Sequence, residues 1–211
     1  MPNKTIFENM QRIGIDELGL SATGLTIIGG RPAMGKTSFL LSLALDMVMH
    51  GNSVAIFSLE MSKKQLLMRL LSNISNLPLG EIRYKDELSD SETAQISEAM
   101  EKLQGLPLFI DDTLGLSVTE LRAKVERLVR EHGVKMIAID YLQLMSDGEN
   151  STPRDSDITK ITHSLKELSK ELDISVIASL LLCRKNEDTT CEVWRPALSD
   201  VRKIGFNEKD A

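Results

Sequence analysis

Aromatic side chains are scarce in this chain, since only 4% of its 211 residues are Phe, Trp or Tyr. We therefore expect a core built mainly from Leu, Ile, Val and Met. No apolar run approaches the roughly 20 residues that a membrane-spanning helix needs, and residues 1–10 lack the apolar middle of a signal peptide. These absences argue against a helical membrane protein, and we expect no membrane partner.

Cysteine is also rare, because Cys183 and Cys191 are the only two in the sequence. They have no CxxC spacing and no histidine close by. We therefore expect two reduced thiols rather than a zinc site or a disulfide, and we predict a cytoplasmic protein.

Positive charge is not in excess, since the formal net charge is −6. A globally acidic protein is not a non-specific binder of polyanions, although a few cations in a channel can still hold nucleic acid. The remaining composition, 42% hydrophobic and 27% charged, is ordinary for one soluble globular domain.

Short apolar runs alternate with amphipathic segments along the chain, which predicts an α/β fold with a mainly parallel sheet and helices on both faces. The expected strands are residues 25–29, 54–59, 108–111, 136–139 and 174–182. Three helix starts carry the capping-box pattern, namely Ser62 with Gln65, Ser89 with Glu92 and Ser117 with Glu120. The helix after Ser117 is expected to stop at Gly133.

A further helix is predicted by apolar residues at alternating spacings of three and four: Ile158, Ile161, Leu165, Leu168 and Leu172. Two polar stretches, residues 146–157 and 184–196, are expected to be loops. Both follow strands, so they belong to the edge of the sheet where ligands bind in open α/β folds.

Residues 30–37 match the P-loop pattern GxxxxGK[ST] in full. Gly30 and Gly35 let the chain curl so that backbone N–H groups point at phosphate oxygens, and the helix expected over residues 38–49 directs its positive end there. Lys36 brings a cation to the β- and γ-phosphates, and Thr37 offers its hydroxyl to Mg²⁺. The predicted ATP-binding residues are Gly30, Arg31, Pro32, Ala33, Met34, Gly35, Lys36, Thr37 and Ser38. A chance glycine-rich turn is the alternative, disfavoured by the strand before it and the helix after it.

Two carboxylates end apolar strands at the same sheet edge. Asp140 closes the fourth expected strand, in the position of a Walker B residue that holds the Mg²⁺ shell together with Thr37. Glu60 follows the second strand and is the best candidate for the base or water-positioning residue. Asp111 and Asp112 also end a strand there, but we interpret them as structural or loop-capping residues.

Three separated motifs resemble the ATPase domain of the bacterial replicative DNA helicase (DnaB) family. They are Arg31-Pro32-Ala33-Met34-Gly35-Lys36-Thr37, Phe57-Ser58-Leu59-Glu60-Met61 and Ile139-Asp140-Tyr141-Leu142-Gln143-Leu144-Met145, and Ser199-Asp200-Val201-Arg202 resembles a later SDLR-like segment. The resemblance runs from about Phe7 to the end of the chain. It implies a RecA-like P-loop NTPase fold over residues 21–211, preceded by an approach segment at residues 1–20.

The same resemblance implies a hexameric ring that binds ATP with Mg²⁺ and couples hydrolysis to movement on single-stranded DNA, with other replication proteins as further partners. It implies that Lys36 and Thr37 contact phosphates and metal, that Glu60 and Lys36 are catalytic residues, and that Asp140 is the carboxylate of the metal shell.

The sequence departs from the family after the fifth strand. Where the family has a run like SQLNR, this chain has Leu180-Leu181-Leu182-Cys183-Arg184. Leu181 therefore stands in place of the Gln that senses the γ-phosphate, and a Leu side chain forms no hydrogen bond. We also expect that the chain lacks the family's amino-terminal domain and its last strands, whose arginine finger typically contributes a rate factor of about 10³–10⁵. The segment between Leu18 and Leu25, which leads to the P-loop, looks shorter than the matching segment of the family.

Two loops of the family contact DNA, and the matching stretches here are residues 146–157 and 184–202. The predicted DNA-binding residues are Arg154, Arg184, Lys185, Arg195 and Arg202. Acidic neighbours dilute these cations, so solvated polar loops remain an alternative. Trp194 either stacks on a nucleic-acid base or packs against other side chains of the protein.

Two functions stay open from the sequence. One is an ATP-dependent DNA helicase motor domain. The other, motivated by Leu181 and the missing arginine, is a non-hydrolysing or weakly hydrolysing ATP-binding relative that acts as an interaction or regulatory protein. A recombinase-type or signalling RecA-like ATPase is less favoured because of the run from Tyr141 to Met145.

Overall fold

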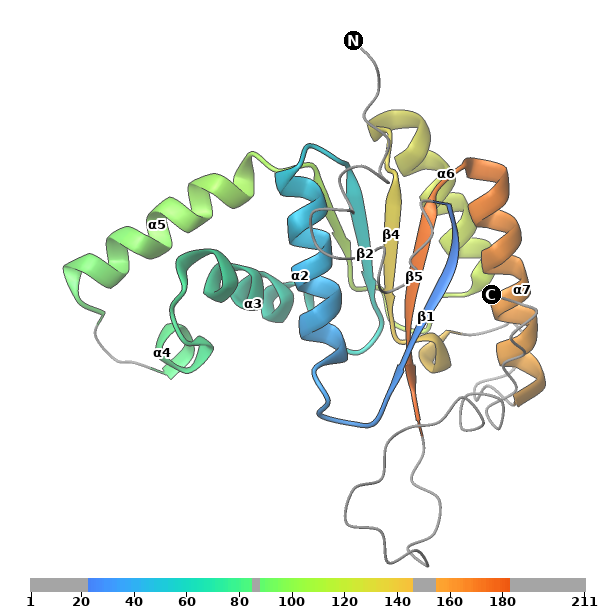
Figure 1. The fold of residues 1–211 in the computed structure, drawn as a ribbon, viewed down its shortest axis with the longest axis horizontal. Coiled ribbons are helices and arrows are strands. Elements are labelled where there is room, and N and C mark those ends of the chain that lie inside the picture. The colour runs from blue at the N-terminus through green and yellow to red at the C-terminus, as the bar shows by residue number, and fades with distance from the viewer. Residues whose placement is uncertain (1–22, 85–87, 146–154, 183–211) are drawn as a thin grey trace, which may run out of the picture.

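A five-stranded sheet forms the centre of the protein in the computed structural model, which describes residues 23–84, 88–145 and 155–182 (Figure 1). The strands are β1 Gly24–Gly30, β2 Val54–Ser58, β3 Leu108–Asp111, β4 Met136–Asp140 and β5 Ser175–Leu181. Their order is β1-β5-β4-β2-β3, and every pairing is parallel. The predicted parallel sheet is confirmed, and each expected strand end lies within one residue of the observed one.

Helices cover both faces of this sheet. They are α2 Lys36–Met49, α3 Lys63–Ser75, α4 Leu79–Tyr84, α5 Asp90–Gln104, α6 Val118–His132 and α7 Asp155–Leu172, with a short 3₁₀ helix η3 Leu142–Leu144. Figure 1 shows α2 to α5 on one side of the sheet and α6 and α7 on the other. Within the described part of the chain, no helix is long and apolar enough to cross a membrane.

Side chains of the central strands alternate between two cores. Along β4, Ile137 and Ile139 pack in the cluster under α6 and α7, whereas Met136 and Ala138 pack in the cluster under α2 and α3. All side chains of β2 and β4 are buried. This two-sided burial explains why these strands read as uninterrupted apolar runs.

The predicted helix caps are confirmed at all three positions. Capping boxes begin α3, α5 and α6, and α6 ends at Gly133, whose φ of 61° lies in the left-handed region. The apolar stripe on α7 is confirmed as well, since Ile158, Ile161, Leu165 and Leu168 are buried.

One local expectation needs correction, and two short helices were missed. The loop expected over residues 146–157 is wrong at its end, because α7 already begins at Asp155. The helices α4 and η3 were not predicted: each is only one or two turns long, and α4 buries no residue, so neither produces an apolar period. Residues 1–20 and the loop expected over residues 184–196 lie outside the described residues.

Candidate functional site

The segment between β1 and α2 curls tightly at the carboxyl edge of the sheet. Gly35 precedes α2 with a φ of 81°, and Ala33 has a φ of 60°. A Cβ atom added to Gly30 would lie 3.3 Å from both Cγ and Cδ of Lys36. Glycine at position 30 therefore allows the close approach of the Lys36 side chain, and glycine at position 35 allows a left-handed backbone.

The amino terminus of α2 differs from those of the other long helices with a described start. It has no side-chain cap and no acidic residue in its first turn, whereas α3, α5 and α6 each begin with a capping box. The first N–H groups of an α-helix have no partner within the helix, and the helix dipole makes this end positive. The start of α2 is therefore suited to an anion such as a phosphate group.

Lys36, the first residue of α2, folds back over the loop. Its Nζ donates to the carbonyl oxygens of Gly30 and Arg31, each at 2.8 Å. Burial lowers the pKa of the Lys36 ammonium and outweighs the opposite effect of the Asp140 and Glu60 carboxylates. This cation therefore lies close to both predicted carboxylates, as a triphosphate site requires.

Asp140 ends β4 and is held by two hydroxyl groups. Thr37 donates through Oγ1 to Asp140 Oδ2 at 2.5 Å, and Ser179 on β5 donates to Oδ1. The residue is only 4% exposed. The carboxylate is thus fixed beside the Thr37 hydroxyl, and both are hard oxygen ligands of the kind that Mg²⁺ prefers.

This donor set fits Mg²⁺ better than a metal that needs several protein ligands. Among the described residues, no group of three or more His, Cys, Asp or Glu side chains could hold a metal ion. Mg²⁺ keeps several waters and commonly binds through one or two carboxylates together with substrate phosphates. Thr37 and Asp140 supply a site of that type.

Glu60 follows β2 and reaches the same edge. The backbone N–H of Leu59 donates to the carbonyl oxygen of Asp140 at 2.8 Å, which joins the ends of β2 and β4. Glu60 itself is exposed. Burial, followed by the charges of Glu60 and Asp140, raises the pKa of Tyr141, so the phenol also lies near both carboxylates.

The phosphate loop, Lys36, Glu60 and Asp140 line one cavity of about 370 Å³. Its lining residues are Pro32, Ala33, Met34, Gly35, Lys36, Thr37, Ser38, Glu60, Arg69, Asp140, Tyr141 and Leu181. The structure therefore brings together all predicted ATP, Mg²⁺ and catalytic residues except Gly30 and Arg31, whose carbonyl groups bind Lys36. Sequence reasoning missed Arg69 of α3, because nothing in its local sequence distinguishes it from a surface arginine.

Leu181 contributes only an apolar wall to this cavity. It pairs with Gly30 across β5 and β1. On its other side, the Gln143 amide donates to the Leu181 carbonyl at 2.7 Å and accepts from the Leu181 N–H at 3.1 Å. The side-chain amide of Gln143 thus continues the sheet beyond the end of β4.

Asp111 and Asp112 have structural roles, which confirms their interpretation. The Asp112 carboxylate accepts from the N–H of Lys63 at 2.8 Å and so caps the start of α3. Asp111 accepts from Lys124 Nζ at 2.6 Å and from the N–H of Thr113.

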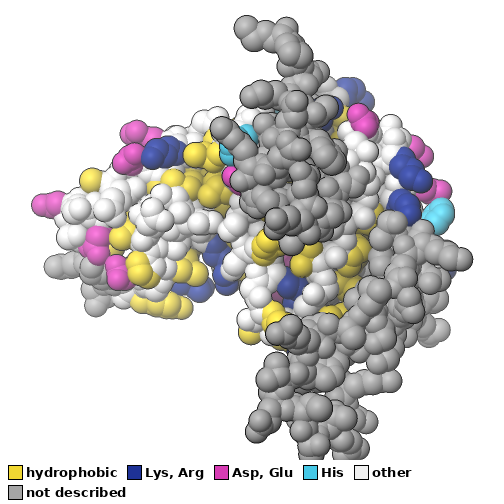
Figure 2. Space-filling view, viewed as in Figure 1, with side chains coloured by type: hydrophobic (Ala, Val, Ile, Leu, Met, Phe, Trp, Pro, Cys, Tyr) yellow, Lys and Arg dark blue, Asp and Glu magenta, His cyan; other side chains and the backbone are white. Residues whose placement is uncertain are grey.

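The predicted DNA-binding residues all lie outside the described residues. These are Arg154, Arg184, Lys185, Arg195 and Arg202, and Trp194 and both cysteines lie outside as well. Figure 2 shows acidic side chains over the outer part of α5, a helix that carries four Asp or Glu residues. That surface is unsuited to a phosphate backbone.

Comparison with known proteins agrees with this geometry. Residues 5–211 match the family model described as the DnaB-like helicase C terminal domain. Replicative DNA helicase DnaB of Nostoc sp. is 43% identical over 190 residues, which cover 89% of this chain and 21% of that protein. Replicative DNA helicase DnaB of Geobacillus stearothermophilus is 39% identical over 195 residues, which cover 92% of this chain and 42% of that protein. The chain spans less than half the length of these curated relatives.

Solved structures lead to the same family. One solved chain, described as an ATPase domain, superposes with a TM-score of 0.84 at 30% identity, over 98% of this chain and 78% of that one. A DnaB-like replicative helicase, described with its interactions with primase, superposes with a TM-score of 0.82 at 31% identity, over 91% of this chain and 46% of that one. With its RecA-like sheet and the P-loop, Glu60 and Asp140 at one edge, this chain belongs to the family of DnaB-like helicase C-terminal domains.

Proposed function

We propose that this chain is the ATPase motor domain of a replicative DNA helicase, which binds ATP with Mg²⁺ and couples hydrolysis to movement on single-stranded DNA. The observation that carries the proposal is the uncapped start of α2, facing one cavity together with Lys36 and the bonded pair Thr37 and Asp140. A phosphate cradle, an ammonium group and hard oxygen ligands are the parts that a bound Mg·ATP requires.

The loop and the start of α2 bind the phosphates. Backbone N–H groups from Gly35 to Ser38 lie at the positive end of the helix, and Lys36 adds a full charge beside them. The ammonium has three donors, of which the Gly30 and Arg31 carbonyls use two. The third donor is available to a phosphate oxygen.

Hydrolysis depends on Glu60. Water attacks the γ-phosphorus, the bond from that phosphorus to the ADP oxygen breaks, and the Glu60 carboxylate orients the water and accepts its proton. Thr37 and Asp140 would hold Mg²⁺, which would neutralise charge on the phosphate oxygens. Lys36 adds further charge stabilisation at the phosphates.

The proposals that this chain binds single-stranded DNA and other proteins are based on its similarity to the relatives named above. Those proteins are named replicative DNA helicases, and one solved relative is described with primase. We extend to this chain a ring-shaped homo-oligomer, single-stranded DNA as the track, and a replication protein as partner. The predicted DNA contacts are Arg154, Arg184, Lys185, Arg195 and Arg202.

A steady-state ATPase assay on the wild type and Glu60→Gln tests the hydrolytic core, with and without single-stranded DNA. Both proteins should bind Mg·ATP, and the variant should turn over about 10²- to 10⁴-fold more slowly because it lacks the base. Glu98→Gln is the matched control, since Glu98 is an exposed carboxylate on α5 that pairs with Lys102.

A wild type that turns over no faster than Glu60→Gln would refute the motor. In that case the second candidate function is the non-hydrolysing ATP-binding relative. The specific observation behind it is Leu181, which lines the cavity without offering a hydrogen bond.

A further inference from the structure

The turn that carries Glu60 runs from the end of β2 to the start of α3. Ser58 is the last residue of β2, and Lys63 is the first residue of α3. Glu60 is exposed and lines the cavity at the phosphate loop. Because packing does little to fix an exposed side chain, the position of the Glu60 carboxylate depends on the backbone of this turn.

The Ser58 hydroxyl closes the turn from the inside. Its Oγ donates to the carbonyl oxygen of Met61 at 2.8 Å and accepts from the Met61 N–H at 3.2 Å. One side chain therefore binds both polar backbone groups of the residue that follows Glu60. Ser58 is 1% exposed, so both bonds are shielded from competing water.

The two ends of the turn are attached to neighbouring strands. Ser58 is paired with Asp140 in the register of β2 and β4, and the N–H of Leu59 donates to the Asp140 carbonyl oxygen at 2.8 Å. At the other end, the Asp112 carboxylate, which follows β3, accepts from the N–H of Lys63 at 2.8 Å. The turn is thus held from β4 on one side and from the end of β3 on the other.

The bond from Asp112 is additional to what α3 needs in order to begin. Ser62 and Gln65 already form a complete capping box at this helix start. What the Asp112 carboxylate adds is a link between the loop after β3 and the turn of Glu60. Such a link restricts the turn, which is what a group that orients a water molecule requires.

We propose that Ser58 and Asp112 are positioning residues for Glu60, and that they hold the turn so that its carboxylate faces the water that attacks the γ-phosphate. Neither is among the residues that line the cavity, so both act through the backbone of the turn. This proposal rests on the proposed ATP hydrolysis and adds which residues orient its base.

Ser58→Ala, made in the wild type and in Glu60→Gln, tests the proposal through steady-state ATP hydrolysis and calorimetric binding of Mg·ATP. In the wild type, it should lower kcat about 10- to 100-fold through misplacement of the carboxylate and leave the affinity for Mg·ATP within about 2-fold. In Glu60→Gln it should cause no further loss of kcat, because the base that Ser58 positions is already gone. General damage to the fold would lower kcat in both backgrounds.

Asp112 gives a second pair of variants at an exposed position, where unfolding is not expected. Asp112→Ala should lower kcat about 3- to 10-fold. Asp112→Asn keeps an oxygen that accepts from the Lys63 N–H, and should restore kcat to within about 2-fold of the wild type.

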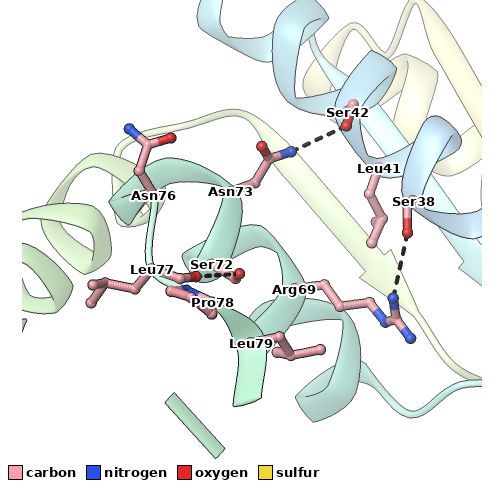
Figure 3. A pocket seen from close by; sticks show the side chains of 10 residues that line it. All are labelled: Ser38, Leu41, Ser42, Arg69, Ser72, Asn73, Asn76, Leu77, Pro78 and Leu79. Atoms are coloured by element: carbon pink, nitrogen blue, oxygen red, sulfur yellow. Dashed lines mark hydrogen bonds between the residues drawn. The ribbon is translucent and has the colours of Figure 1, made fainter. Parts of the chain in front are cut away.

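The control for Ser58→Ala is Ser72→Ala, at the other end of α3. The Ser72 hydroxyl donates to the carbonyl oxygen of Leu77 at 2.6 Å (Figure 3). This variant also removes a hydroxyl that binds the backbone of a turn, but a turn that does not carry Glu60. It should keep the kcat of the wild type, and urea denaturation measures the stability that each variant loses.

The outcomes separate this proposal from the hydrolytic function itself. If Glu60→Gln is slower than the wild type but Ser58→Ala and Asp112→Ala are not, the positioning role is refuted and the motor stands. An equal loss of kcat from Ser58→Ala in both backgrounds also refutes it. If Ser58→Ala does not fold, the Asp112 variants decide by the same comparison. If the wild type is no faster than Glu60→Gln, the proposed hydrolysis fails, and the positioning role fails with it.

Discussion

Ser179→Ala tests whether Asp140 is held in place as the structure describes. Ser179 is fully buried, and its hydroxyl donates to Asp140 Oδ1. Asp140 is nearly buried as well, and its other oxygen accepts from Thr37. The substitution therefore leaves a buried carboxylate oxygen without this donor. A hydrogen bond to a charged group contributes about 1.5–3 kcal/mol, and an acceptor left buried without a partner adds to the cost. We expect the free energy of unfolding to fall by about 2–3 kcal/mol.

The chain offers a closely matched control in Ser169→Ala. Ser169 lies on α7, is as fully buried as Ser179, and its hydroxyl has no hydrogen-bond partner among the described residues. Both variants remove one buried hydroxyl and keep the Cβ atom. Removing an unpaired polar group should be neutral or slightly stabilising. The difference between the two variants therefore isolates the bond to Asp140.

Urea denaturation of the wild type and both variants gives the comparison, provided that the slope m is the same in all three. A second readout is the Mg²⁺ concentration at half-maximal ATP binding, which Ser179→Ala should raise because the carboxylate loses one of its two supports. If Ser179→Ala destabilises no more than Ser169→Ala, the bond to Asp140 contributes no net stability. The inference that the hydroxyl groups of Thr37 and Ser179 hold Asp140 in place would then be wrong.

Two further predictions concern single charged groups. Lys36→Ala should weaken Mg·ATP about 10- to 100-fold, the equivalent of one charged hydrogen bond; unchanged affinity in calorimetry would refute its placement at the phosphates. Burial alone would raise the pKa of Asp111, but hydrogen bonds from Lys124 and Thr113 outweigh it and lower the pKa below its usual value. The ionised Asp111 carboxylate therefore stabilises the fold at a pH above its pKa in the unfolded chain, about 3.9. This stabilisation is lost as the pH falls through the lower pKa of Asp111 in the folded protein. Asp111→Asn should flatten this part of an acid unfolding curve, and a curve that superposes on the wild type would contradict the assignment.

The P-loop and the strands were predictable because their signals are local. Gly35 is required by the positive φ of its own backbone, and Gly30 by the close approach of the Lys36 side chain. Asp140 was found because a single carboxylate ends an apolar strand. In each case a few neighbouring residues specify the geometry, so no knowledge of the sheet order is needed.

Arg69 and Ser179 were not predictable in the same way, because their roles depend on which elements lie side by side. Ser179 reaches Asp140 only because β5 is the neighbour of β4 in the sheet. Arg69 reaches Ser38 only because α3 packs beside α2. One signal for Ser179 was available: a serine inside a doubly buried strand needs a hydrogen-bond partner.

The position of β5 explains why its carboxyl end matters for any chemistry at this site. The strand lies between β1, which leads into the phosphate loop, and β4, which ends in Asp140. Ser179 uses this position to support the carboxylate, whereas Leu181 gives the cavity an apolar wall. The nearby amide of Gln143 makes two hydrogen bonds to the Leu181 backbone. Both Asp140 oxygens accept from hydroxyl groups, so Glu60 is the exposed carboxylate among the described residues that line the cavity. It is therefore the group that we propose takes a proton from water. Hydrolysis by this domain should thus depend on Glu60 more strongly than on any side chain of β5.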